Sequence, residues 1–253
     1  MKDTILFGDC RETLKNLTNS SARMCVTSPP YYGLRDYGGE KNQIGQEESP
    51  EEYVKQMVEV FRLVRDVLTD DGTLWLNIGD SYYNYRSDGN YPKQTVSKTR
   101  QDLPQNTPVR GNKLKGLKSK DLIGIPWMLA FALRADGWYL RQDIIWHKPN
   151  PMPESVKDRC TKAHEYIFLL SKSKNYFYDN EAIKEPAKDW GTRDRTNGKY
   201  HNPGSGLAPH SGLTKSYATK NKRSVWSVTV KPYKGAHFAT YPEDLVEPCI
   251  LAG

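Results

Sequence analysis

The chain has 253 residues and a mass of 28.9 kDa, which fits one sizeable domain or one domain with inserts. No apolar run approaches the roughly 18 residues that span a bilayer, and the N-terminus lacks a signal-peptide core, so neither a membrane protein nor a secreted one is expected. The four cysteines form no C-x-x-C pair, which argues against a metal site or a disulfide framework and favours a reducing cytoplasm.

The net charge of +7 is concentrated in two stretches of the chain. Residues 85–120 hold nine Lys or Arg against two Asp or Glu, and residues 181–224 hold nine against four. Neither stretch has a helical or strand period, so both are predicted to be basic loops or inserts on a more acidic frame. Their interleaved aromatic residues suit a polyanion, while solubilising surface loops are an equal alternative from charge alone.

Short apolar runs alternate with helical patterns in the first third of the chain. Residues 4–7 predict a strand that ends at Gly8-Asp9, and a helical stretch follows over residues 11–17. Residues 23–27 predict a second strand, which runs directly into Ser28.

The clearest helix start is Ser49-Pro50-Glu51-Glu52, which combines a Ser N-cap, a Pro in the first turn and a Glu three residues later. Apolar residues at helical spacing follow until Asp71-Gly72. Residues 73–78 then predict a third strand that ends at Gly79-Asp80.

The same alternation continues after the first basic stretch. Residues 126–135 predict a helix, and residues 139–146 and 165–170 predict strands. The pattern at 240–243 resembles a second capping box, which opens a helix that ends at Gly253. We therefore expect a single α/β domain over 1–253 with a mostly parallel sheet and ligands at the carboxyl ends of its strands.

The most informative segment is Thr27-Ser28-Pro29-Pro30-Tyr31-Tyr32. Two consecutive prolines fix φ twice and remove two N–H donors, so the local carbonyls are left to accept hydrogen bonds. The Ser28 hydroxyl adds an acceptor and Tyr31 adds a stacking face. Together they would hold a planar base, and hydrogen bonds from its amino group to Ser28 and the Pro29 carbonyl would free the nitrogen lone pair for attack. A stiff turn is the simpler interpretation of these residues taken alone.

Residues 27–38 resemble the catalytic loop of the amino-directed DNA methyltransferases, in the group with permuted motif order. Four other segments match that family in the same order. They are Phe7-Gly8-Asp9-Cys10 near the cofactor adenine, 73–80 as the next core strand, 144–154 at the target-base pocket, and 237–243 on the cofactor side.

The resemblance implies a Rossmann-like fold that transfers a methyl group from S-adenosylmethionine to a base of double-stranded DNA, with no covalent enzyme intermediate. The base must leave the stack, because its amino group is otherwise paired. A Ser at the first motif position favours N4 of cytosine over N6 of adenine. The implied catalytic residues are Ser28, Pro29, Pro30 and Tyr31. The implied cofactor-binding residues are Asp9, Cys10, Phe238, Tyr241, Pro242 and Glu243.

The resemblance also implies the roles of the basic stretches and of possible partners. Residues 181–224 match the target-recognition region by position and charge, and residues 85–120 are a second candidate for contacting DNA. A restriction endonuclease counterpart, and the cytoplasm of a bacterium or a phage-infected host, follow from the same family.

The family's glycine-rich loop, Asp-Pro-Phe-x-Gly-x-Gly after a strand, does not occur in the sequence. It is expected shortly after Gly253, so the resemblance implies a sheet incomplete at the C-terminus. A missing C-terminal segment or a second chain would then supply the loop together with the strands beside residues 4–7.

Several alternatives remain open at this stage. A non-catalytic DNA-binding remnant of a methyltransferase would also carry the basic stretches. Pro248-Cys249 resembles the nucleophile of enzymes that attack cytosine C5, but Cys249 falls on an apolar helix face, which favours burial. Asp9 would either accept from the cofactor adenine or cap the following helix, and Phe238 and Tyr241 would either line the cofactor pocket or pack in the core.

Overall fold

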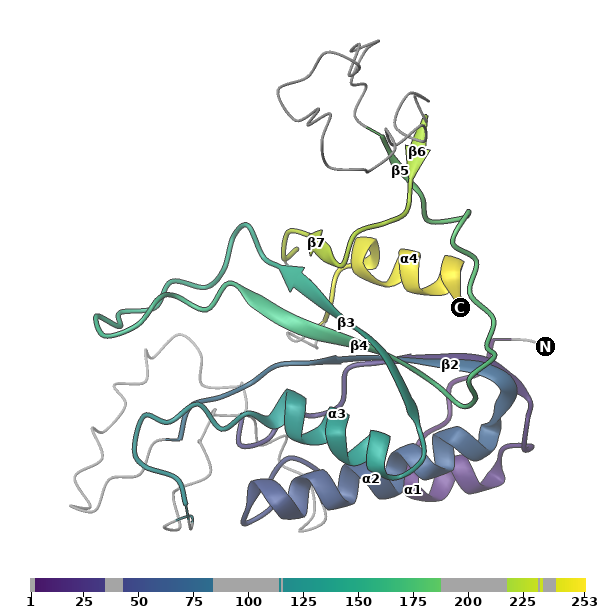
Figure 1. The fold of residues 1–253 in the computed structure, drawn as a ribbon. Coiled ribbons are helices and arrows are strands. Elements are labelled where there is room, and N and C mark those ends of the chain that lie inside the picture. The colour runs from purple at the N-terminus through teal and green to yellow at the C-terminus, as the bar shows by residue number, and fades with distance from the viewer. Residues whose placement is uncertain are drawn as a thin grey trace, which may run out of the picture.

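The computed structural model describes residues 3–34, 43–83, 114, 116–187, 218–231, 233 and 240–253. Within them, a five-stranded sheet carries helices on both faces (Figure 1). The strand order is β1-β2-β4-β3-β7. The strands are β1 (Ala22–Thr27), β2 (Leu68–Ile78), β3 (Tyr139–His147), β4 (His164–Ser171) and β7 (Val225–Ser227).

The predicted α/β class is confirmed, but the expectation of a mostly parallel sheet is wrong. β1 pairs parallel with β2, and β3 pairs parallel with β7, whereas β4 runs antiparallel to both β2 and β3. Residues 148–163 connect β3 to β4 without a helix, whereas the crossover between parallel neighbours usually contains one. The reversal places the start of β4 at the edge where β2 and β3 end.

One face of the sheet is covered by α2 (Pro50–Val67) and α3 (Ile125–Ala135), with α1 (Cys10–Thr13) and the 3-10 turn η1 (Leu14–Asn16) beside α2 (Figure 1). The predicted start of α2 is confirmed, because the Ser49 hydroxyl accepts from the Glu52 N–H at 3.2 Å. The apolar side of α2 and α3 packs in one core with side chains of β2 and β4. The largest fully buried members of this core include Tyr53, Met57, Phe61, Leu129 and Phe168.

The opposite face is covered by α4 (Glu243–Ala252), which packs against Trp75 and the apolar side chains of β3 and β4. The helix is confirmed, but its predicted capping box is wrong. Pro242 is the N-cap and its side chain makes no capping bond. Thr240 therefore lies two positions before the N-cap, where its hydroxyl cannot cap the first turn. A two-stranded ribbon of β5 (Glu185–Pro186) and β6 (Thr219–Lys220) stands apart from the main sheet (Figure 1).

The strand predicted at residues 4–7 is not formed. Ile5, Leu6 and Phe7 are 77%, 51% and 88% exposed, and none of the strands in the described part of the chain pairs with them. An apolar run becomes a strand only when a neighbour supplies the ladder of hydrogen bonds and a surface to pack on.

Several predictions fall outside the described residues. These include residues 85–113 of the first basic stretch, residues 188–217 of the proposed recognition region, and Phe238. Among the helices that are described, none is both long and apolar enough to cross a membrane.

Candidate active site

The segment Ser28–Tyr31 continues from the end of β1, beside the end of β2, and is held by contacts from two other elements. The buried Tyr53 of α2 donates its hydroxyl proton to the Pro30 carbonyl at 2.8 Å. Gly79, directly after β2, lies against the Tyr31 ring so closely that a Cβ there would be 2.7 Å from Cε2 of Tyr31. Ser28 is half-buried, and no residue that the structure describes donates to the Pro29 carbonyl. The two acceptors predicted for an amino group are therefore both available.

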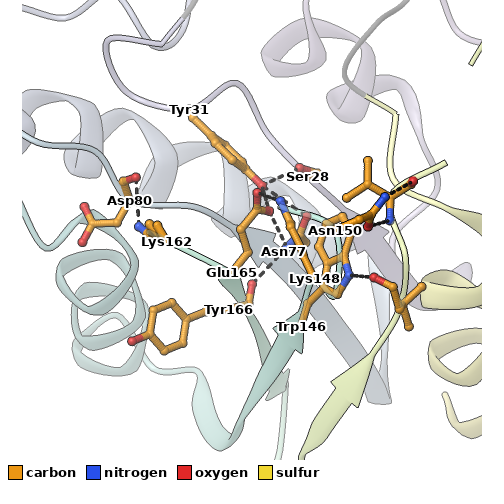
Figure 2. A network of polar contacts seen from close by, with 12 residues as sticks. Ser28, Tyr31, Asn77, Asp80, Trp146, Lys148, Asn150, Lys162, Glu165 and Tyr166 are labelled. Carbon is orange, nitrogen blue, oxygen red and sulfur yellow. Dashed lines mark hydrogen bonds and ion pairs between the residues drawn. The ribbon is translucent and has the colours of Figure 1, made fainter. Parts of the chain in front are cut away.

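A network of polar contacts joins this segment to the middle of the sheet (Figure 2). The Tyr31 hydroxyl donates to Glu165 Oε2 at 2.7 Å, although the two residues are 134 positions apart. Asn77 Oδ1 lies 3.2 Å from the same hydroxyl. Ser28 Oγ donates to the Tyr31 hydroxyl at 3.3 Å. The Tyr31 ring thus has its hydroxyl fixed on the sheet while its edge packs on Gly79.

Glu165 is the centre of the network. Its Oε1 forms an ion pair with Lys148 of the segment after β3, and the two side chains are 17% and 18% exposed. Asn77 Nδ2 donates to Glu165 Oε2 at 3.2 Å and to the Tyr166 carbonyl at 3.1 Å. A buried charge is tolerated only when it is paired and hydrogen-bonded. Glu165 meets this requirement through its ion pair with Lys148 and its hydrogen bond from Asn77.

Burial and the neighbouring Glu165 carboxylate raise the pKa of Tyr31 well above its usual value. The hydroxyl therefore keeps its proton at neutral pH and acts as a hydrogen-bond donor to Glu165. Lys148 is not a solvated surface lysine, because its ammonium pairs with Glu165 and lies 4.2 Å from the centroid of the Trp146 ring.

Trp146, Asp80 and Lys162 have structural contacts around the network (Figure 2). Trp146 is 4% exposed and donates its ring N–H to the Val228 carbonyl at 2.8 Å, so it packs in the core. The Asp80 carboxylate accepts from the N–H groups of Gly124 and Ile125 at 3.0 and 3.1 Å and so caps α3. Burial lowers the pKa of Lys162, whose ammonium donates to the Asp80 carbonyl at 3.0 Å.

The candidate cofactor residues that are described form two groups. Asp9 accepts from the Arg11 N–H at 2.8 Å and caps α1, and its hydrogen bonds to Arg11 lower the pKa of the carboxyl. Cys10 is the exposed first residue of α1. The second group lies at the start of α4, where Tyr241 is half-buried, Pro242 is buried and Glu243 is exposed. No contact between the described residues joins the two groups.

The surface beside Asp9 fits part of the expected cofactor. Ile5, Leu6 and Phe7 expose most of their apolar area next to a carboxylate that is itself 40% exposed. Apolar side chains beside one hydrogen-bond acceptor are the groups that an adenine ring with its amino group requires. The capping role of Asp9 is compatible with this, because a carboxylate has further lone pairs to offer.

The structure opposes a covalent mechanism at cytosine C5. Cys249 is 1% exposed, and its thiol contacts the Leu245 carbonyl at 3.5 Å inside α4. Burial raises the pKa of this thiol to about 12, so it is protonated and unreactive.

Asn77, Glu165 and Lys148 were not identified as functional from the sequence. The signal available in the sequence was a polar residue within a predicted strand. Asn77 interrupts the apolar run at 73–78 and is 5% exposed, and Glu165 is the first residue of the predicted strand at 165–170. Buried polar side chains within strands are uncommon and indicate a partner or a function.

Comparison with known sequences gives extensive similarity to DNA methyltransferases. Residues 22–253 match the N6/N4 methyltransferase family, which is described as DNA methylase. The type II methyltransferase M.Cfr9I of Citrobacter freundii is 47% identical over 249 residues, which cover 98% of this chain and 72% of that protein. M.SmaI of Serratia marcescens is also 47% identical and is matched over 98% of this chain and 74% of its own length.

Solved structures agree with the sequence comparison in their fold. The cytosine-N4-specific PvuII DNA methyltransferase superposes with a TM-score of 0.58 at 16% identity, over 97% of this chain and 68% of its own. A candidate DNA modification methylase from Thermus thermophilus, complexed with S-adenosyl-L-methionine, gives a TM-score of 0.52 at 20% identity, over 96% and 71%. The fold is thus the Rossmann-like fold of such enzymes. The chain belongs to the N6/N4 DNA methylase family and is an S-adenosylmethionine-dependent DNA methyltransferase.

Proposed function

We propose that this DNA methyltransferase acts on N4 of cytosine, at the site formed by Ser28, Pro29, Pro30 and Tyr31. The observation that carries the proposed site is the pair of available acceptors at the end of β1, the half-buried Ser28 hydroxyl and the Pro29 carbonyl. A Ser at this motif position is typical of the N4-cytosine enzymes, and the PvuII enzyme with its cytosine-N4 specificity has the same fold.

The two acceptors would orient the amino group of the target base. One N–H of the group would donate to Ser28 Oγ and the other to the Pro29 carbonyl, which would take the nitrogen out of conjugation with the ring and free its lone pair for attack. When bound, S-adenosylmethionine supplies a methyl group made electrophilic by its sulfonium. The target base leaves the helix stack in this proposal, because its amino group is otherwise engaged in base pairing. Tyr31 would stack on the base through its ring, whose hydroxyl is held by Glu165 and whose edge lies against Gly79.

The alternative target is N6 of adenine, which the same family includes. Its exocyclic amino group would meet the same two acceptors, so only the identity of the product separates the two reactions. The larger purine ring would need more space beside Tyr31.

The test is transfer of a radiolabelled methyl group to unmethylated DNA, followed by digestion to nucleosides. We would run it with this chain and with the chain joined to the C-terminal segment of M.SmaI, each with a Ser28→Ala control. Labelled N4-methylcytosine that depends on Ser28 supports the proposal. Labelled N6-methyladenine overturns the choice of base, and transfer that is unaffected by Ser28→Ala overturns the proposed site.

Two further parts of the proposal concern partners. Residues 181–224 and 85–120 would contact the DNA, the former reading its sequence. Exchanging 181–224 for the matching segment of a family member that methylates a different DNA sequence should change which sequence is methylated, and an unchanged sequence would contradict this. Because the similar proteins are type II methyltransferases of bacteria, we also propose a restriction endonuclease counterpart and a bacterial or phage-infected cytoplasm.

A further inference from the structure

We propose that Glu165 is a positioning residue that fixes the hydrogen-bonding direction of Ser28, so that the Ser28 hydroxyl can only accept a hydrogen bond from the target base. The inference rests on the proposed role of Ser28. It assigns a function to a residue that lies on a strand 134 positions away from the catalytic segment.

The direction follows from the number of protons available. An ionised carboxylate can only accept hydrogen bonds, so the proton between Tyr31 and Glu165 belongs to Tyr31. A phenol has a single proton, and the 2.7 Å contact to the carboxylate is shorter than the 3.2 Å contact to Asn77 Oδ1. The Tyr31 oxygen can then only accept from its third partner. Ser28 therefore donates its only hydroxyl proton to the Tyr31 oxygen, at 3.3 Å.

The surroundings of Glu165 keep this direction from reversing. Lys148 donates to Glu165 Oε1, so the second carboxylate oxygen is also engaged as an acceptor. Asn77 uses both amide protons, one on Glu165 and one on the Tyr166 carbonyl, so its oxygen is the atom that faces Tyr31. Of the three described partners of the Tyr31 hydroxyl, only Ser28 has a proton to donate (Figure 2).

The consequence is a site that selects an amino group over a carbonyl. The lone pairs left on Ser28 Oγ and on the Pro29 carbonyl are both acceptors, so an N–H of the base is bound by each. A base with a carbonyl oxygen at that position, such as thymine or guanine, would place a third acceptor against them. A chain of hydrogen bonds that ends on an anion also strengthens Ser28 as an acceptor, while positive charge grows on the amino nitrogen as it attacks the methyl carbon.

The experiment is a double-mutant cycle of Glu165→Gln and Tyr31→Phe, with kcat for methyl transfer and the dissociation constants for DNA and cofactor as readouts. The amide that Glu165→Gln introduces can donate to Tyr31 and reverse the chain, while Tyr31→Phe cuts it and leaves the ring on Gly79. Each single change should lower kcat about 10- to 100-fold, with both dissociation constants within about 2-fold of wild type. The double variant should be no slower than the worse single variant, because the chain is broken only once.

Rescue and a matched control separate this role from general support of the fold. Glu165→Asp keeps an ionised acceptor and should regain part of kcat. Asp136→Asn makes the same carboxylate-to-amide change in an ion pair with Arg62 and Arg65 at the end of α3, away from the network, and should leave kcat unchanged. A thermal melt of each variant shows whether it is folded, and Tyr31→Phe removes only one oxygen atom.

The outcomes distinguish this inference from the proposed function. If Ser28→Ala transfers methyl groups at the wild-type rate, the proposed site itself is wrong. If Ser28→Ala is slow but the effects of Glu165→Gln and Tyr31→Phe multiply, or either variant is as fast as wild type, then Glu165 does not act through Tyr31 and Ser28. That result overturns the present inference alone.

Discussion

Two polar clusters stand where the sequence predicts parts of one site, and they are built differently. The network of Ser28, Tyr31, Asn77, Glu165 and Lys148 joins strands β2 and β4 to the segments that follow β1 and β3, through contacts between residues up to 134 positions apart. The Asp9–Arg11 pair joins residues two positions apart at the surface. The geometry of the first cluster depends on how the strands of the sheet are arranged, while the geometry of the second depends only on the first turn of α1.

This difference sets what each cluster can do. Partly buried charges that are paired across strands keep a fixed geometry, which suits the orientation of a reacting group. An exposed local ion pair contributes about 0–1 kcal/mol and can exchange its partner for water or a ligand. We therefore expect changes in the network to alter kcat, and changes at Asp9 to alter cofactor binding.

The largest effect on the methylation rate is expected for Gly79→Ala, which tests whether the network must hold the Tyr31 ring in a fixed position. The added Cβ would lie 2.7 Å from Cε2 of Tyr31, so the ring has to move and its hydroxyl leaves Glu165. Displacing a positioned group by about 1 Å costs on the order of 100-fold in rate. Single-turnover methylation should show that loss in kcat, while a DNA mobility shift stays as in wild type. An unchanged rate would mean that the ring is free to swing without consequence.

Lys148→Met tests whether the charge pair also holds the sheet together. The Met side chain can keep the apolar contact with Trp146, but Glu165 loses its cation in a site where both side chains are less than one-fifth exposed. We expect a loss of about 1–3 kcal/mol in the free energy of unfolding, below the range for a fully buried pair because some water reaches the site. Urea denaturation measures it.

The matched control for this change is Lys231→Met. Lys231 pairs with Asp244 at 2.6 Å, but the two side chains are 56% and 59% exposed. Because this pair is exposed and screened by solvent, removing the Lys231 charge should leave the free energy of unfolding almost unchanged. Equal losses in the two variants would show that partial burial does not distinguish the two ion pairs.

The sequence was sufficient for local features and insufficient for strand order. The helix start at Ser49 and the segment Ser28–Tyr31 depend on adjacent residues, and both were predictable. The place of Glu165 depends on the reversal of β4, which brings the head of that strand to the edge where β2 ends. Hydrophobic periodicity reports which face of a strand is buried, and it carries no information on which strands are neighbours. The strand prediction at residues 4–7 was wrong for the same reason, since the apolar pattern of these residues carries no information on a pairing partner.

Asp9→Ala tests the second cluster, the exposed Asp9–Arg11 pair. Loss of the N-cap should cost about 1 kcal/mol in stability, which Asp9→Asn restores because Asn also caps helices. If the carboxylate also accepts from the cofactor, Ala raises KM for S-adenosylmethionine up to about 10-fold at unchanged kcat. An unaltered KM would leave Asp9 with only its capping role.

The ion pair of Asp9 predicts a pH dependence with a defined sign. Arg11 lowers the pKa of Asp9 in the folded protein, so the folded state is favoured when the carboxyl is ionised. The stabilisation is present above the unfolded-state pKa and is lost as the pH falls through the lowered, folded-state pKa. The stability advantage of wild type over Asp9→Asn should therefore disappear in acid, and a difference that grew on acidification would contradict the pairing.

The smallest effect on activity is expected for Cys249→Ala. The thiol is buried in α4 and its pKa is raised to about 12, so it has no part in the reaction, and kcat should equal that of wild type. In the native protein a thiol reagent should modify the exposed Cys10 and Cys160 and spare Cys249, which becomes reactive only on unfolding. Mass spectrometry of the labelled peptides shows this directly. Loss of methyl transfer in a folded Cys249→Ala variant would instead require a cysteine nucleophile, and the direct transfer to an amino group oriented by Ser28 would then be wrong.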